Sequence, residues 1–79
     1  VAIAMYPNPA NSQVTISNSS NIQLEKAAIY DINGKLVMNI NLQDMQGEKV
    51  IDVSNLASGV YVVQINGEQA SVVKRLIKE

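Results

Sequence analysis

Short apolar runs, separated by turn-forming residues, make up most of the chain. The longest run, residues 60–65, reads Val-Tyr-Val-Val-Gln-Ile and is rich in the β-branched and aromatic side chains that favour a strand. It follows Ala57-Ser58-Gly59, a predicted turn whose glycine tolerates a positive φ. Val60, Val62 and Gln64 should point to one side of this strand and the intervening residues to the other. Since both sides carry apolar residues, we expect a central strand covered on both faces.

The first part of the chain predicts two short strands. Residues 1–6 are apolar without helical spacing and end at Pro7-Asn8-Pro9. This pattern indicates an edge strand, because proline lacks a backbone donor and restricts the residue before it. Residues 13–17 alternate polar and apolar side chains, so Val14 and Ile16 are expected to point inward. The polar residues 18–21 then predict a loop.

Two Asn-Gly dipeptides predict β-hairpins. Residues 22–31 contain tolerable helix formers, but Asn33-Gly34 follows them and favours a strand that turns through a type I′ hairpin. In the same way, Asn66-Gly67 is expected to join residues 60–65 to residues 69–77. The strand after Asn33-Gly34 would bury the face that carries its alternating apolar residues, which are Leu36, Met38, Ile40 and Leu42.

Together with one more short strand at residues 48–53, these elements predict an all-β fold. We expect an antiparallel, immunoglobulin-like β-sandwich of about seven short strands, with a small barrel as the alternative. The 79 residues fit a single domain, residues 1–79, with one core. No apolar run approaches the about 20 residues of a membrane span. No signal peptide is recognisable at the start, so an export signal of a longer parent would lie before Val1.

The composition removes most catalytic chemistry. The chain has no His and no Cys, which supply the usual general base, thiol nucleophile and soft metal ligands. Its seven acidic residues are scattered, and no spacing pairs two of them as acid and base. Asp31-Ile32-Asn33-Gly34 is only a fragment of a calcium loop, and a hairpin turn is favoured there. We therefore expect no enzyme, no metal, no cofactor and no small-molecule substrate.

Charge is mild overall but basic at one end. A net charge of −1 gives no field that would recruit nucleic acid. Lys74, Arg75 and Lys78 place half of the six basic residues in the last six positions. The simplest interpretation is a solvated edge strand that these charges protect against aggregation. Tyr61, two residues after Gly59, is interpreted as a corner residue whose ring packs while its hydroxyl reaches the backbone.

Four motifs follow one another along the chain: Tyr6-Pro7-Asn8-Pro9-Ala10, Ile29-Tyr30-Asp31-Ile32-Asn33-Gly34-Lys35, Leu56-Ala57-Ser58-Gly59-Val60-Tyr61 and Lys74-Arg75-Leu76-Ile77-Lys78. Each motif is weak alone. In this order, and over nearly the whole chain, they resemble the type A C-terminal sorting domain of the type IX (Por) secretion system of Bacteroidetes. The resemblance implies a β-sandwich at the end of a larger exported protein.

By this resemblance, the domain carries a covalently linked upstream cargo from the periplasm across the outer membrane, so that the cargo is secreted or reaches the cell surface. Its partners would be the type IX translocon and a sortase-like peptidase, which removes the domain and can attach the cargo to surface lipopolysaccharide. By this resemblance the family's terminal motif corresponds to Lys74, Arg75, Leu76, Ile77 and Lys78, and we expect this motif to contact the secretion machinery. We expect a mainly structural role for the other motif residues, which are Tyr6, Pro7, Asn8, Pro9, Gly34, Leu56, Gly59 and Tyr61.

The residues themselves suggest how the terminal motif could be recognised. A last strand at a sheet edge offers unpaired backbone groups and cationic side chains, which suit capture by strand addition or by an acidic groove. The alternative functions are an immunoglobulin-like adhesion or carbohydrate-binding module and a structural spacer in a secreted protein. A glycan or protein partner of the isolated domain would favour the first, and a chain that continues past Glu79 would favour the second.

Overall fold

The computed structural model describes residues 3–19 and 22–79, and all regular structure in that part of the chain is strand. Accordingly, no described segment forms a helix long and apolar enough to cross a membrane. The predicted first strand begins at Ile3, and Val1 and Ala2 lie outside the described residues, as do Ser20 and Asn21 of the predicted loop. The strands are β1 (Ile3–Tyr6), β2 (Gln13–Asn18), β3 (Leu24–Tyr30), β4 (Leu36–Asn41), β5 (Glu48–Asp52), β6 (Gly59–Gly67) and β7 (Ser71–Lys78).

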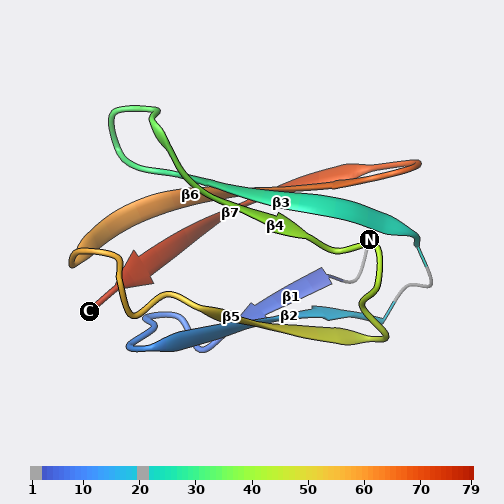
Figure 1. The fold of residues 1–79 in the computed structure, drawn as a ribbon, viewed down its shortest axis with the longest axis horizontal. Coiled ribbons are helices and arrows are strands. Elements are labelled where there is room, and N and C mark those ends of the chain that lie inside the picture. Colours follow the sequence, from blue (N-terminus) through green and yellow to red (C-terminus); the bar gives the residue numbers. More distant parts are fainter. Residues whose placement is uncertain (1–2, 20–21) are drawn as a thin grey trace.

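The seven strands form two antiparallel sheets that pack face to face (Figure 1). One sheet has the order β1-β2-β5 and the other the order β4-β3-β6-β7. The predicted antiparallel β-sandwich is therefore confirmed, and so is the placement of the first and last strands at sheet edges. β6 contacts β3 on one side and β7 on the other, so it is internal to its sheet, as the apolar run predicted.

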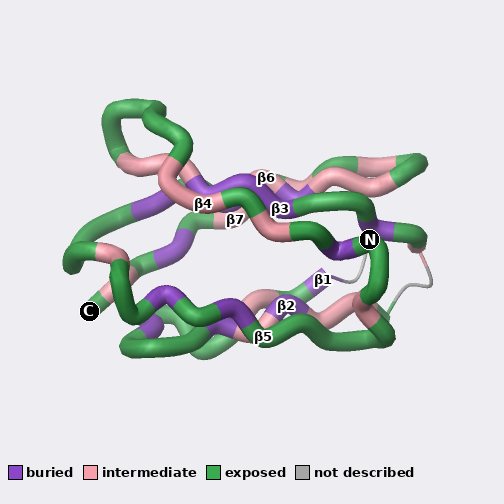
Figure 2. The backbone as a smooth tube through the Cα atoms, viewed as in Figure 1, coloured by how far each residue is buried: buried purple, intermediate pink, exposed green. Residues whose placement is uncertain are grey.

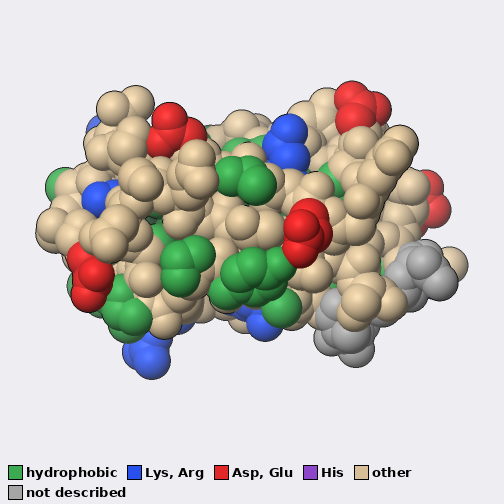
Figure 3. Space-filling model, turned by 90° about the horizontal axis from the view of Figure 1, so that it is seen from below, with side chains coloured by type: hydrophobic (Ala, Val, Ile, Leu, Met, Phe, Trp, Pro, Cys, Tyr) green, Lys and Arg blue, Asp and Glu red, His purple; other side chains and the backbone are tan. Residues whose placement is uncertain are grey.

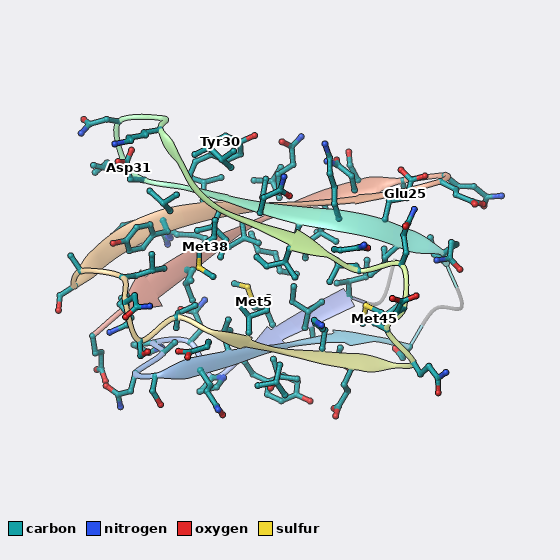
Figure 4. The ribbon with its side chains drawn as sticks, viewed as in Figure 1. Met5, Glu25, Tyr30, Asp31, Met38 and Met45 are labelled. Atoms are coloured by element: carbon teal, nitrogen blue, oxygen red, sulfur yellow. The ribbon has the colours of Figure 1, made fainter. Side chains whose placement is uncertain are left out.

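The core is a cluster of buried residues from both sheets, and Figure 2 shows buried segments (purple) in both layers. Met5 and Met38 point between the two sheets, from opposite layers, and pack against this cluster (Figure 4). Among the described residues no polar or charged residue is buried, so the core is apolar throughout. Burial of each large side chain contributes roughly 1.5–3 kcal/mol. The largest fully buried side chains are Ile16, Ile29, Leu42, Ile65, Leu76, Val14, Val53 and Val63.

The expectation that β6 is covered on both faces is wrong. Tyr61, Val63 and Ile65 are buried, but Val60 and Val62 on the opposite face are 41% and 40% exposed. A two-layer sandwich covers only the inner face of each sheet, and no third layer lies over β6 within the described chain. The outer face of this sheet therefore presents apolar side chains to solvent.

The hairpin between β3 and β4 is confirmed, but its turn is not of type I′. Asp31 and Lys35 pair through an N–H to carbonyl bond of 2.9 Å, and Gly34 donates to the carbonyl of Asp31 at 3.0 Å. Gly34 has a φ of +85°. The loop thus has three residues, 32–34, and ends on a left-handed glycine, which is the arrangement of a type I turn with a bulge.

The alternation predicted for β4 holds for most of the strand and fails at its start. Leu42 is fully buried and Met38 and Ile40 pack against the core, whereas Leu36 is 48% exposed. The pairing with β3 passes from Met38 directly to Leu36, so Val37 is the extra residue of a bulge. The bulge turns Val37 toward the core and Leu36 to the outside.

The hairpin between β6 and β7 is also confirmed, but Asn66-Gly67 is not its turn. Both residues belong to β6, and Gly67 pairs with Ala70 through an N–H to carbonyl bond of 2.8 Å. Gly67 is needed for a different reason, because a Cβ there would lie 2.7 Å from the carbonyl oxygen of Gln23. That carbonyl accepts a hydrogen bond from Glu68 N–H at 3.0 Å, which holds the start of β3 against the hairpin.

Candidate functional site

The terminal motif lies on β7, and the alternation of the strand divides its side chains between two faces. Leu76 is fully buried in the core. Lys74 and Lys78 share its side of the strand and are half-buried. Arg75 and Ile77 point the other way and are exposed on the outer face of the sheet. The structure thus brings the five residues together along one strand but not onto one surface.

The edge of β7 is partly closed by the segment that follows β1. Asn8 donates its Nδ2 to the carbonyl of Arg75 at 2.7 Å and accepts from Ile77 N–H through Oδ1 at 2.9 Å. Ala10 continues this contact, because its N–H donates to the carbonyl of Ile77 at 2.8 Å and its carbonyl accepts from Glu79 N–H at 2.9 Å. The Tyr6-Pro7-Asn8-Pro9-Ala10 motif therefore pairs with the end of the terminal motif. Figure 1 shows the loop after β1 (blue) on the same side as the end of β7 (red).

Prolines flank Asn8 and shape this segment. The peptide bonds Tyr6-Pro7 and Asn8-Pro9 are both cis. Pro7 and Pro9 are exposed, whereas Ala10 is fully buried, so the segment leaves the edge of the first sheet at β1 and ends in the core beside β7. Because proline offers no N–H, the side-chain amide of Asn8 and the backbone of Ala10 are the groups that bond to β7.

Tyr6 lies on the outer face of the first sheet, and its hydroxyl donates to Glu48 Oε2 on β5 at 2.5 Å. This hydrogen bond to a carboxylate is the main cause of a raised Tyr6 pKa. Both side chains are exposed, and hydrophobic side chains gather in the middle of this face, as Figure 3 shows. The bond links β1 to β5 across β2.

The third motif forms the corner that leads into β6. Tyr61 is 7% exposed and its hydroxyl donates to the carbonyl of Ala57 at 2.7 Å, so the predicted corner residue is confirmed. Gly59 has a φ of +154°, as its place in a turn suggested. Leu56 packs against the core and its N–H donates to the carbonyl of Val53 at 3.0 Å.

Acidic groups are spread over the surface and engage in turns. Asp31 accepts hydrogen bonds from Asn33 N–H and Lys35 N–H, each at 2.9 Å, and so stabilises its own hairpin. Glu25 lies far from Asp31, near the other end of the sheet (Figure 4).

Asp52 accepts a hydrogen bond from the N–H of Ser54, and hydrogen bonds from the side chain and backbone of Ser54 hold the pKa of Asp52 below its ordinary value. Within residues 3–19 and 22–79 no three acidic side chains gather to hold a metal ion.

Two shallow surface hollows accompany these features. One lies over β3 and β4 and contains a single carboxylate, that of Glu25. The other lies beside Pro7 and Pro9 and is lined otherwise by small polar residues. Neither of these two hollows brings a nucleophile, a base and an acid together.

Sequence reasoning missed the contact between Asn8 and β7. The two partners are 69 residues apart, and nothing in the local pattern around Asn8 specifies a distant strand edge. The available signal was an isolated amide between two prolines, which is a group free to bond outside its own strand.

Comparison with known proteins adds a family. The model of the secretion system C-terminal sorting domain matches residues 4–79. Among curated proteins, the chain is similar to Beta-agarase D of Zobellia galactanivorans, with 29% identity over 75 residues. The matched region is 95% of this chain but 14% of the agarase, so the chain spans a small part of that relative.

Proposed function

Because the chain belongs to the family of type IX secretion system C-terminal sorting domains, we propose that it directs a covalently attached upstream cargo protein across the outer membrane. The match over residues 4–79, which takes in all of the described sandwich except Ile3, is the observation that carries the proposal. The 14% coverage of Beta-agarase D is what a small module on a larger protein would give. The cargo would pass through the periplasm and end in the medium or on the cell surface.

Export would be followed by removal of the domain. We assign the cleavage to a sortase-like peptidase, which then attaches the cargo to surface lipopolysaccharide or releases it. The domain itself would not react, since its family is a sorting tail and its described acids are separated in space. Any catalytic activity would belong to the cargo.

The recognition element would be the basic end of β7. Lys74, Arg75 and Lys78 concentrate positive charge on a chain of net charge −1, so they would attract an acidic surface of the translocon. Leu76 lies under them in the core and would act by holding the strand in place. Ile77 would contribute an apolar contact on the outer face.

A fusion experiment tests the proposed function. Residues 1–79 are joined to the C-terminus of a fluorescent protein that carries a periplasmic export signal, and the fusion is expressed in a Bacteroidetes host. Fluorescence is measured at the cell surface and in the medium, with a matched host lacking the type IX translocon as the control. We expect translocon-dependent appearance outside the cell. Retention of a folded fusion in the periplasm would contradict export and favour an adhesive module.

A further inference from the structure

The edge of β7 is closed over one half and open over the other. We propose that the open half, residues 71–75, is a docking edge to which the export machinery adds an extended strand with acidic side chains. This inference rests on the proposed function and names the partner chemistry of the same strand.

The parity of β7 means whether its odd- or its even-numbered residues bond to β6, and it follows from the pairing of the two strands. Gly67 bonds to Ala70 at the start of the hairpin, so the even-numbered residues of β7 bond to β6 in the antiparallel register. The odd-numbered residues turn their backbone groups to the edge. The contacts at the far end agree, since Ile77 N–H, Ile77 carbonyl and Glu79 N–H all bond outward to Asn8 or Ala10.

The closed half ends at Arg75. Asn8 donates a hydrogen bond to the carbonyl of Arg75, and the residues before Asn8 turn away into β1. Val73 has the same parity as Arg75 and Ile77, so its N–H and carbonyl face the open edge. An incoming strand can therefore pair with Val73 and with the N–H of Arg75, but it must end where Asn8 begins.

The side chains beside the open edge define the partner. Val73 is 65% exposed, which is an unusual feature for an edge strand because apolar edges invite pairing. Lys74 and Arg75 follow it in the strand and place one positive charge on each face of the sheet. Side chains of an added strand would lie directly opposite these residues, so an apolar residue suits Val73 and acidic residues suit Lys74 and Arg75. A second copy of β7 would add its own basic residues to an already basic edge, so like-charge repulsion disfavours self-pairing relative to an acidic strand.

Proline substitution tests strand addition without disturbing β6. Because Val73 N–H faces the edge, Val73→Pro removes a donor that β6 does not use, and edge strands tolerate such a proline. Val73→Ala is the matched control, since it shortens the side chain and keeps the N–H. Both are placed in the fluorescent fusion, and export is measured beside the unsubstituted fusion. We expect Val73→Pro to reduce export by about tenfold or more, the effect of losing one or two interface hydrogen bonds, and Val73→Ala to remain close to the unsubstituted fusion.

Thermal unfolding of each fusion domain shows whether the proline variant is folded. Should Val73→Pro melt far below the parent, Ser71→Pro replaces it, because Ser71 has the same parity and a proline is tolerated at the first residue of a strand. Normal export of a folded proline variant overturns strand addition. If Arg75→Glu also blocks export in that case, the machinery reads the charges through an acidic groove. Failure of the unsubstituted fusion to leave the cell would instead overturn the proposed function.

Discussion

The hydroxyl of Tyr61 donates a hydrogen bond of 2.7 Å to the carbonyl oxygen of Ala57. The two partners are four positions apart in the chain, and Gly59 lies between them with a φ of +154°. The ring of Tyr61 is 7% exposed and packs in the core, so one side chain joins the corner before β6 to the interior. This corner sets where β6 begins, and β6 pairs with both β3 and β7.

Removal of this hydroxyl should weaken the domain without changing its fold. Tyr61→Phe keeps the buried ring and loses one hydrogen bond, so we expect the free energy of unfolding to fall by about 1 kcal/mol. Urea unfolding followed by circular dichroism measures the change. Tyr30→Phe, on the same sheet, is the control. If the Tyr61→Phe domain is as stable as its parent, the hydroxyl of Tyr61 does not stabilise the corner.

Asn8 should contribute to stability through its two bonds to β7. Asn8→Ala leaves the carbonyl of Arg75 and the N–H of Ile77 to water, and we expect a loss of about 1 kcal/mol in the free energy of unfolding. Asn11→Ala is a matched control, since Asn11 is an exposed neighbour for which the described chain provides no side-chain hydrogen bond. Equal urea midpoints for the two variants would contradict the contribution of Asn8.

The elements of this fold could be predicted because their signals are local. Strand alternation placed Val14 and Ile16 in the core, and both are fully buried. The apolar run at residues 60–65 identified an internal strand, and the turn chemistry before it identified the corner at Tyr61. Each of these rests on neighbours within about ten residues, where periodicity and turn preference act.

Features that depend on distant neighbours could not be predicted in the same way. The sequence pattern indicated that Gly67 is a turn residue. A glycine is required there because the carbonyl of Gln23, 44 positions earlier in the chain, leaves no room for a Cβ. Strand alternation divides the terminal motif between two faces, but the burial of Leu76 and the exposure of Arg75 follow from the side on which the other sheet packs. The closure of the β7 edge by Asn8 joins a segment that follows β1 to the other sheet, so it depends on how the two sheets pack. These contacts are set by tertiary packing.

Replacement of Gly67 or Gly34 by alanine should destabilise the domain, for a different reason at each position. In Gly67→Ala the new Cβ meets the Gln23 carbonyl at 2.7 Å, and backbone must shift, at a cost of about 1–3 kcal/mol. Gly34→Ala meets no atom within 4 Å, but its φ of +85° costs about 1 kcal/mol for a residue with a Cβ. Because asparagine adopts this φ more readily, Gly34→Asn should recover part of the loss. The same recovery in Gly67→Asn would contradict a steric cause at that position.

Asp52 should make the free energy of unfolding depend on pH. Its pKa is lowered in the folded domain by hydrogen bonds from Ser54, so its contribution is present above the ordinary aspartate pKa and is lost as the pH falls through the folded pKa. We expect Asp52→Asn to be less stable than its parent at neutral pH, and the difference to shrink on acidification through and below 3.8, the ordinary value. Urea midpoints across this pH range measure the difference. Ser54→Ala should reduce the same pH dependence, and an unchanged dependence in both variants would refute the assignment.

The basic residues of β7 should matter for export and little for stability. The triple variant Lys74→Ala, Arg75→Ala and Lys78→Ala removes exposed or half-buried charges, so we expect its melting temperature to stay within a few degrees of the parent while its cargo accumulates in the periplasm. Leu76→Ala instead opens a cavity in the core and should cost about 2–5 kcal/mol, so its export defect would accompany unfolding. A charge-preserving triple, Lys74→Arg, Arg75→Lys and Lys78→Arg, is the matched control and should be exported. Normal export of the folded alanine triple would show that the machinery does not read these charges.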